Sequence, residues 1–88
     1  ALNALEQGAN RDRTGYLSLQ TARIAFEVGD GARAERYAAD AAEKNKSPDA
    51  YLLWLAVLRG LQKNQAASNT LTTAKALFPN DPRFQQLP

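Results

Sequence analysis

The side chains that could perform chemistry in this chain are few in kind. Histidine and cysteine are both absent, so the commonest general base, the commonest metal ligand and a thiol nucleophile are missing. The remaining candidates are Ser18, Ser47 and Ser68, with three tyrosines, the lysines and nine carboxylates. The best close carboxylate pair is Asp40 with Glu43, which we expect on an exposed helix face between cations. We therefore expect no catalytic residue, no bound metal and no cofactor.

Two of the polar residues have a structural explanation. Ser47 precedes Pro48 and Asp81 precedes Pro82, which is the pattern of a helix N-cap followed by proline in the first turn. Both are therefore expected to begin helices rather than to act on a substrate. No segment alternates convincingly at the period of a β-strand, so no phosphate loop of the strand-to-helix type is predicted either.

Apolar residues recur at helical spacing through the middle of the chain. The expected helices cover residues 15–28, 32–45, 48–62 and 65–78. Thr14 is placed to cap the first of them, and the third is apolar nearly all round, so neighbours must cover it on most sides. Short connections make consecutive helices antiparallel neighbours. The sequence thus predicts an all-α chain of helical hairpins.

The two ends of the chain carry partial helical signals. Residues 1–8 are expected to end a helix that closes at Gly8, with residues 9–13 as a linker. At the other end, Phe84 and Leu87 are placed to fold back onto the last hairpin as a short cap, or to belong to a further helix. Because the chain starts without methionine, we interpret it as a processed chain or an excised segment, and we favour a segment of a longer array.

The charge balance disfavours several classes of function. The net charge is +2 with a pI near 9.2, and the charges alternate in sign along most of the chain. Nucleic-acid-binding domains usually show a denser basic face, so nucleic acid is a disfavoured partner. The longest apolar run, residues 50–58, is too short to span a membrane. This segment is therefore not expected to insert into one.

The two central hairpins align with each other at a fixed offset. Ala34 aligns with Ala67, and the expected N-caps Thr14 and Ser47 align too, each pair being 33 residues apart. A period of about 33–34 residues with two helices in each unit is typical of a helical solenoid.

The second of these units resembles a tetratricopeptide repeat (TPR). That family places large apolar residues on the first helix of each repeat, small ones on the second, and proline at the end. The matching positions here are Tyr51, Trp54, Leu58, Ala67, Leu71, Ala74 and Pro79. The alanine spacing on the second helix leaves room for the bulky Tyr51, Trp54 and Leu58 of the first, so we expect these side chains in the core.

The first unit resembles the family less closely. Gly29 and Asp30 occupy the position of the turn between the two helices, and Ala34 holds a small position. Ser18 replaces the expected aromatic residue. In the second unit Leu55 replaces a small residue that normally permits tight packing within the repeat.

The resemblance implies a right-handed α-hairpin solenoid of the TPR type, with two repeats and flanking helical pieces. The repeats would cover residues 14–46 and 47–80. Residues 1–13 would be the end of a preceding helix with its linker, and residues 81–88 the start of a further helix or a cap.

The family binds its partners in a concave groove, lined by positions on the first helix of each repeat. Carried over by register, the groove residues are Tyr16, Leu19, Arg23, Phe26, Glu27, Asp49, Leu52, Ala56 and Arg59. The apolar ones would contact a peptide, and the two arginines would receive a carboxylate. Chaperone-binding TPR proteins carry lysine and asparagine where this chain has Leu19, Arg23 and Leu53, which disfavours that ligand.

We therefore expect a non-catalytic module for protein–protein interaction or assembly, with another protein or a peptide as its partner. The alternative is a structural module whose exposed helix ends associate with further copies, forming a homo-oligomer. A nucleic-acid-binding helical repeat ranks below both. The alanine- and glutamine-rich repeats of bacterial envelope scaffolds are similar, so we expect part of a larger bacterial protein and slightly favour the cell envelope over the cytoplasm.

Overall fold

A computed structural model describes residues 2–86 of the chain, with side chains from residue 6 onward. These residues form six α-helices and no strand. The helices are α1 (Leu2–Arg11), α2 (Tyr16–Glu27), α3 (Gly31–Lys44), α4 (Pro48–Gly60), α5 (Asn64–Leu77) and α6 (Pro82–Gln85). The predicted all-α class is confirmed.

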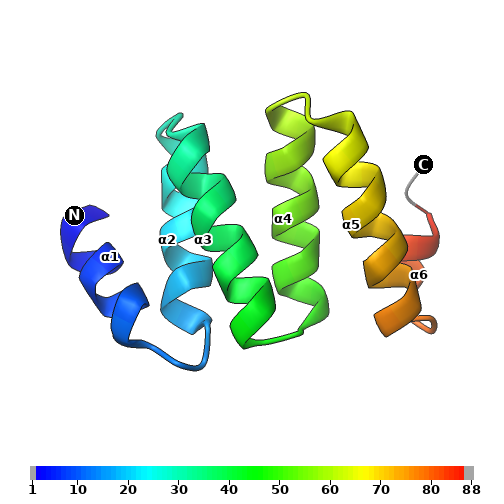
Figure 1. Ribbon diagram of the computed structural model, residues 1–88, viewed down its shortest axis with the longest axis horizontal. Helices are drawn as coiled ribbons and strands as arrows, with labels where there is room; N and C mark the ends of the chain where they lie inside the picture. Colours follow the sequence, from blue (N-terminus) through cyan, green and yellow to red (C-terminus); the bar gives the residue numbers. More distant parts are fainter. Residues whose placement is uncertain (1, 87–88) are drawn as a thin grey trace.

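The helices pack in the order in which the chain makes them. Each of α1 to α4 contacts the helix that follows it, α5 contacts the short α6, and α2 also contacts α4. Figure 1 shows them side by side along the long axis of a body that measures 35 × 26 × 16 Å, with α3 in front of α2 and α5 in front of α6. The short connections make neighbours antiparallel, as predicted, so α2 and α4 run in the same direction.

Helix α1 continues past the residue where we expected it to end. It runs through Gly8 to Arg11, so the prediction that Gly8 closes it is wrong. Gly8 serves a packing role instead, because a Cβ atom there would lie 3.0 Å from a side-chain methyl of Leu17. The missing side chain lets α1 lie close against α2.

The cap of α2 is also different from the one we predicted. Thr14 is not the N-cap; that position belongs to Gly15, whose φ of 83° is in the left-handed region and whose Cβ would lie 3.1 Å from the Ala41 carbonyl oxygen. Asp12 supplies the acceptors: its carboxylate accepts hydrogen bonds from the Leu17 N–H (2.8 Å) and from the N–H and hydroxyl of Thr14 (2.9 and 2.7 Å). These bonds lower the pKa of Asp12 to about 2.

The two other predicted caps are confirmed. Ser47 Oγ accepts a hydrogen bond from the Ala50 N–H at the start of α4 (3.3 Å), and Asp81 accepts one from the Arg83 N–H at the start of α6 (2.9 Å). In each case proline occupies the first turn, where its missing N–H removes no helical hydrogen bond.

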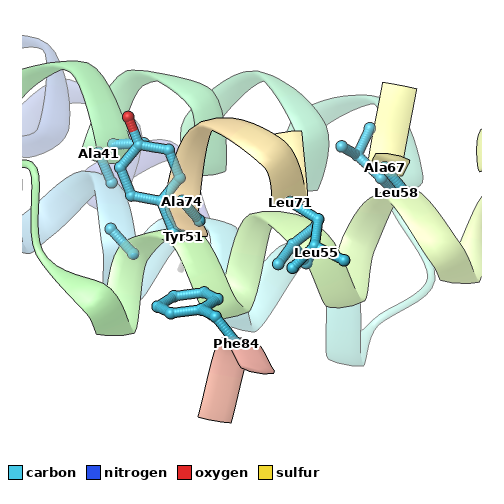
Figure 2. Close-up of a cluster of buried hydrophobic side chains, with 10 residues drawn as sticks. Ala41, Tyr51, Leu55, Leu58, Ala67, Leu71, Ala74 and Phe84 are labelled. Carbon is cyan, nitrogen blue, oxygen red and sulfur yellow. The ribbon is translucent and has the colours of Figure 1, made fainter. Parts of the chain in front are cut away.

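The core consists of two clusters of buried side chains. One lies between α1, α2, α3 and α4 and is built mainly from alanines, with Tyr37 and Val57 as its large members. The other joins α3 to α4, α5 and α6 around Tyr51, Leu55 and Leu71 (Figure 2). Trp54 packs against both clusters. No helix within residues 2–86 is both long and apolar enough to cross a membrane.

The last helix closes the second cluster. Phe84 of α6 is fully buried, and its ring stacks on Phe78 with centroids 5.7 Å apart. Arg83 forms ion pairs with Asp81 of its own helix cap (2.8 Å) and with Asp49 at the start of α4 (3.2 Å), and the second pair joins the segment to α4. Of the two alternatives that we left open for this segment, the structure shows the one in which Phe84 folds back onto the last hairpin, whereas Leu87 lies outside the described residues.

We expect Phe84→Ala to lower the free energy of unfolding by about 3 kcal/mol, the lower end of the usual range for truncating a buried phenylalanine. The reason for the low value is that a four-residue helix can detach without opening the other helices. Gln85→Ala, at the exposed neighbouring position, should change it by less than about 0.5 kcal/mol. Urea denaturation measures both, and a loss below about 1 kcal/mol for Phe84→Ala would contradict the role given to α6.

The Asp12 cap should make stability depend on pH. The pKa of Asp12 is about 2 in the folded protein, below the value of about 4 expected in the unfolded chain. The contribution of Asp12 to the free energy of unfolding is therefore complete above pH 4 and disappears between pH 4 and pH 2. Asp12→Ala should therefore lower the melting temperature at pH 7 and have little effect at pH 2. The exposed carboxylate of Glu27 gives a control variant, Glu27→Ala. If Asp12→Ala lowered the melting temperature by the same amount at pH 7 and at pH 2, this cap would be ruled out.

Candidate functional site

Helix α2 has one buried side and one open side. Its buried residues are Ser18, Thr21, Ala22 and Ala25, which face the neighbouring helices. The predicted groove residues Tyr16, Leu19, Arg23, Phe26 and Glu27 recur every three or four positions on the other side, so they share one face. Leu19 is half-buried against the core, and the other four are exposed. The helix thus presents a continuous stripe of predicted groove residues.

The far end of this stripe contacts α4. The Phe26 ring lies against Gly60, since a Cβ atom on Gly60 would come within 2.9 Å of two of the ring carbons. Because Gly60 has no side chain, the Phe26 ring can pack against the end of α4. Gly60 is the last residue of α4, where glycine is common, so its type alone does not reveal this close approach.

Helix α4 carries a shallow hollow formed by its own side chains. Three predicted groove residues, Leu52, Ala56 and Arg59, line it together with Leu55, and it has a volume of about 210 Å³. Leu52 is half-buried and packs on the second core cluster, while Ala56 is exposed. Leu55 is buried in the second core cluster and also contributes to the lining of this hollow.

Asp49 lies apart from this hollow. It sits in the first turn of α4, and its carboxylate pairs with Arg83 of α6. That ion pair is well exposed on both sides, which limits its contribution to stability. The structure thus brings Leu52, Ala56 and Arg59 together and places Phe26 beside the end of α4, while Asp49 takes part in holding α6.

The predicted groove residues of α2 and α4 include both positive and negative side chains, and these side chains differ in their contacts with the rest of the protein. Arg23 is exposed on α2 and has no carboxylate within 4 Å among the described residues. Glu27 follows it one turn later. Arg59 is half-buried at the hollow and makes an interaction with the protein. Arg23 is therefore the cation on this face that is best placed to receive an anionic group.

Of the close carboxylate pair, Glu43 is exposed as we expected, but Asp40 is not. Asp40 is half-buried rather than exposed, accepts a hydrogen bond from Ser18 Oγ (2.5 Å) and pairs with Lys44 Nζ (2.9 Å). Partial burial raises the pKa of Asp40, but the bonds from Ser18 and Lys44 outweigh it and hold the pKa below its usual value. Ser18 is fully buried, so both side chains serve to join α2 to α3.

Other polar groups on the first hairpin also join helices. Lys44 Nζ donates to the Ala9 carbonyl oxygen (2.9 Å), and Arg33 pairs with Glu6 (3.0 Å), so α3 is tied to α1 at two points. Burial of the Tyr37 phenol, together with the nearby Glu6 carboxylate, raises the pKa of Tyr37. Among the described residues, no three metal-ligating side chains form a group that could hold a metal ion.

Comparison of the sequence with protein-family models gave no match. No curated protein matches the chain significantly, and no solved structure does. Its function must therefore be inferred from the contacts, shapes and charges of its own residues.

Proposed function

We propose that this chain is a non-catalytic protein-interaction module of the TPR type, which binds a peptide on the face formed by α2 and α4. The observation that carries the proposal is the stripe on α2. Tyr16 and Phe26, both exposed large aromatic residues, flank an exposed Arg23 with no carboxylate partner within 4 Å among the described residues. Aromatic residues and arginine are the types that most often dominate binding energy at interfaces.

The arrangement of the hairpins supports the TPR-type repeat. Helices α3 and α5 both contain 14 residues. Helix α5 begins 33 positions after α3 begins and ends 33 positions after α3 ends. Ala34 and Ala67 are buried at equivalent places in the two hairpins, and so are Ala41 and Ala74. In such an array the first helices of the two units, α2 and α4, would share one face, and we place the peptide groove there.

The length of this face limits the length of the peptide that it can bind. From Tyr16 to Phe26 the helix rises about 15 Å, the length of roughly five residues of extended chain. We therefore propose a short peptide with apolar side chains for Phe26 and the Leu52 hollow, and an acidic residue for Arg23. A bidentate pair between a guanidinium and a carboxylate fixes orientation as well as adding energy.

Self-association is the second candidate. Tyr16 is 61% exposed and Val28 65% exposed, so both leave apolar surface that a second copy could cover. Stacking through the α5 end is disfavoured, because Phe84 already fills the place where a further helix would pack. A self-associating surface would then lie on α2.

The peptide proposal is tested by selecting binders from a displayed random-peptide library. We expect the selected peptides to combine apolar residues with Asp or Glu. Arg23→Glu should weaken their binding at least tenfold in fluorescence anisotropy, which is about 1.4 kcal/mol. Arg36→Glu makes the same charge change on α3, where Arg36 lies over the Tyr37 ring, and should leave binding within twofold.

Two results would reject the peptide proposal. One is a set of selected peptides without acidic residues, and the other is equal binding by wild type and Arg23→Glu with unchanged circular dichroism melts. Sedimentation equilibrium at micromolar concentration separates the second candidate: a dimer that Tyr16→Ser dissociates would favour self-association, and a monomer would exclude it.

A further inference from the structure

A second hollow lies on a different side of α4 from the proposed peptide face. It has a volume of about 250 Å³ and is bounded by three helices. Its lining residues are Glu43 of α3, Tyr51 and Trp54 of α4, and Asn69, Thr70 and Thr73 of α5. Trp54 lies two residues after Leu52, about 200° around the helix, so this hollow and the peptide face do not share a surface.

Two hydroxyl groups in this hollow lack a partner in the protein. Tyr51 is only 6% exposed and Thr70 only 8% exposed, yet neither hydroxyl makes a hydrogen bond within the described part of the chain. No fully enclosed side-chain oxygen there is left without a partner. Both hydroxyl oxygens must therefore reach the molecular surface, and the surface that these two residues line is this hollow.

The direction of the Tyr51 side chain agrees with this conclusion. Its ring is fixed on one side by an edge contact to Phe78, with centroids 5.7 Å apart. Figure 2 shows the hydroxyl oxygen of Tyr51 pointing away from Phe84, toward the side of the cluster where Ala41 of α3 lies. A buried tyrosine normally finds a hydrogen-bond partner for its hydroxyl, so this position is one that a ligand could complete.

The polar groups around the hollow favour a positively charged ligand. Glu43 is exposed and has no lysine or arginine nitrogen within 4 Å among the described residues. No cationic side chain lines the hollow. The hydroxyl of Thr73 already donates to the Asn69 carbonyl oxygen (3.2 Å), which leaves its lone pairs as acceptors. The walls thus offer several acceptors and one unpaired negative charge.

We propose that this hollow binds an alkylammonium group. The ammonium would donate its three hydrogens to the hydroxyls of Tyr51 and Thr70 and to the carboxylate of Glu43. Its methylene chain would lie against the rings of Tyr51 and Trp54, which are 6.0 Å apart. The volume suits one lysine-sized side chain or one small amine, since a single water molecule occupies only about 30 Å³.

The chain carries its own reporter for a binding experiment, because Trp54 is its only tryptophan. We expect n-butylammonium chloride to change the Trp54 fluorescence with saturation at millimolar concentrations, against a background of equal sodium chloride. Nα-acetyl-lysine amide represents a lysine side chain in a peptide. Tighter binding of this compound than of butylammonium assigns the site to a partner's lysine, and equal binding assigns it to free amines. The Nε-acetylated form of the lysine compound, which has no positive charge, should not bind.

Three variants test the residues of the site. Glu43→Gln should weaken binding about fivefold, the upper range for an exposed charge pair, whereas Glu27→Gln on α2 should not. Tyr51→Phe and Thr70→Val each remove one hydroxyl and should also weaken binding. Because neither hydroxyl bonds to the protein, neither substitution should lower the melting temperature, and this separates loss of binding from loss of fold.

The proposal is overturned by any of three results. One is the absence of a saturable fluorescence change with either amine up to tens of millimolar. Another is equal binding of the neutral acetylated compound, and the third is unchanged affinity in Glu43→Gln. None of these results bears on the α2 and α4 face, because the selected peptides and Arg23→Glu test that surface independently.

Discussion

The contact between α2 and α3 sets the geometry of the rest of the molecule. Ala22 and Ala25 of α2 and Ala34 and Ala38 of α3 are all fully buried in one cluster, so small side chains fill the contact between the two helices. Alanine buries little apolar area, and this pair of helices gains correspondingly little from the hydrophobic effect. The large buried side chains that supply the rest of the hydrophobic stabilisation are concentrated in α4. That helix therefore needs neighbours on several sides, and it obtains them from α2, α3 and α5.

The same closeness explains the polar contacts of the first hairpin. Ser18 stands where an aromatic residue would not fit between helices joined by alanines, and its hydroxyl bonds to Asp40 instead. This bond lies between two half-buried or buried partners, where an unsatisfied carboxylate would be costly. The contact between α2 and α3 thus includes a buried polar pair, whereas the second hairpin packs the rings of Tyr51 and Phe78 together.

Much of this fold could be read from local signals, because proline, alanine spacing and short connections act within a few residues. Ser47 and Asp81 were predicted as caps for that reason, and both are caps. The cap of α2 could not be found in the same way, since the carboxylate that bonds Leu17 comes from Asp12, five residues earlier. Contacts between helices are harder still to predict from the sequence. The hollow beside Trp54 joins residues from three helices, and nothing in the spacing of Glu43 and Thr70 indicates that they meet.

Trp54 has a consequence for how the two hairpins depend on each other. Its indole packs against both core clusters, so neither cluster can lose its packing without disturbing a side chain of the other. In a linear array of helices, stability divides into the contribution of each unit and the coupling between neighbours. Here Trp54 adds to a coupling that Val57 of α4 and Ala41 of α3 also carry between the two hairpins, so we expect the two halves to unfold together rather than in turn.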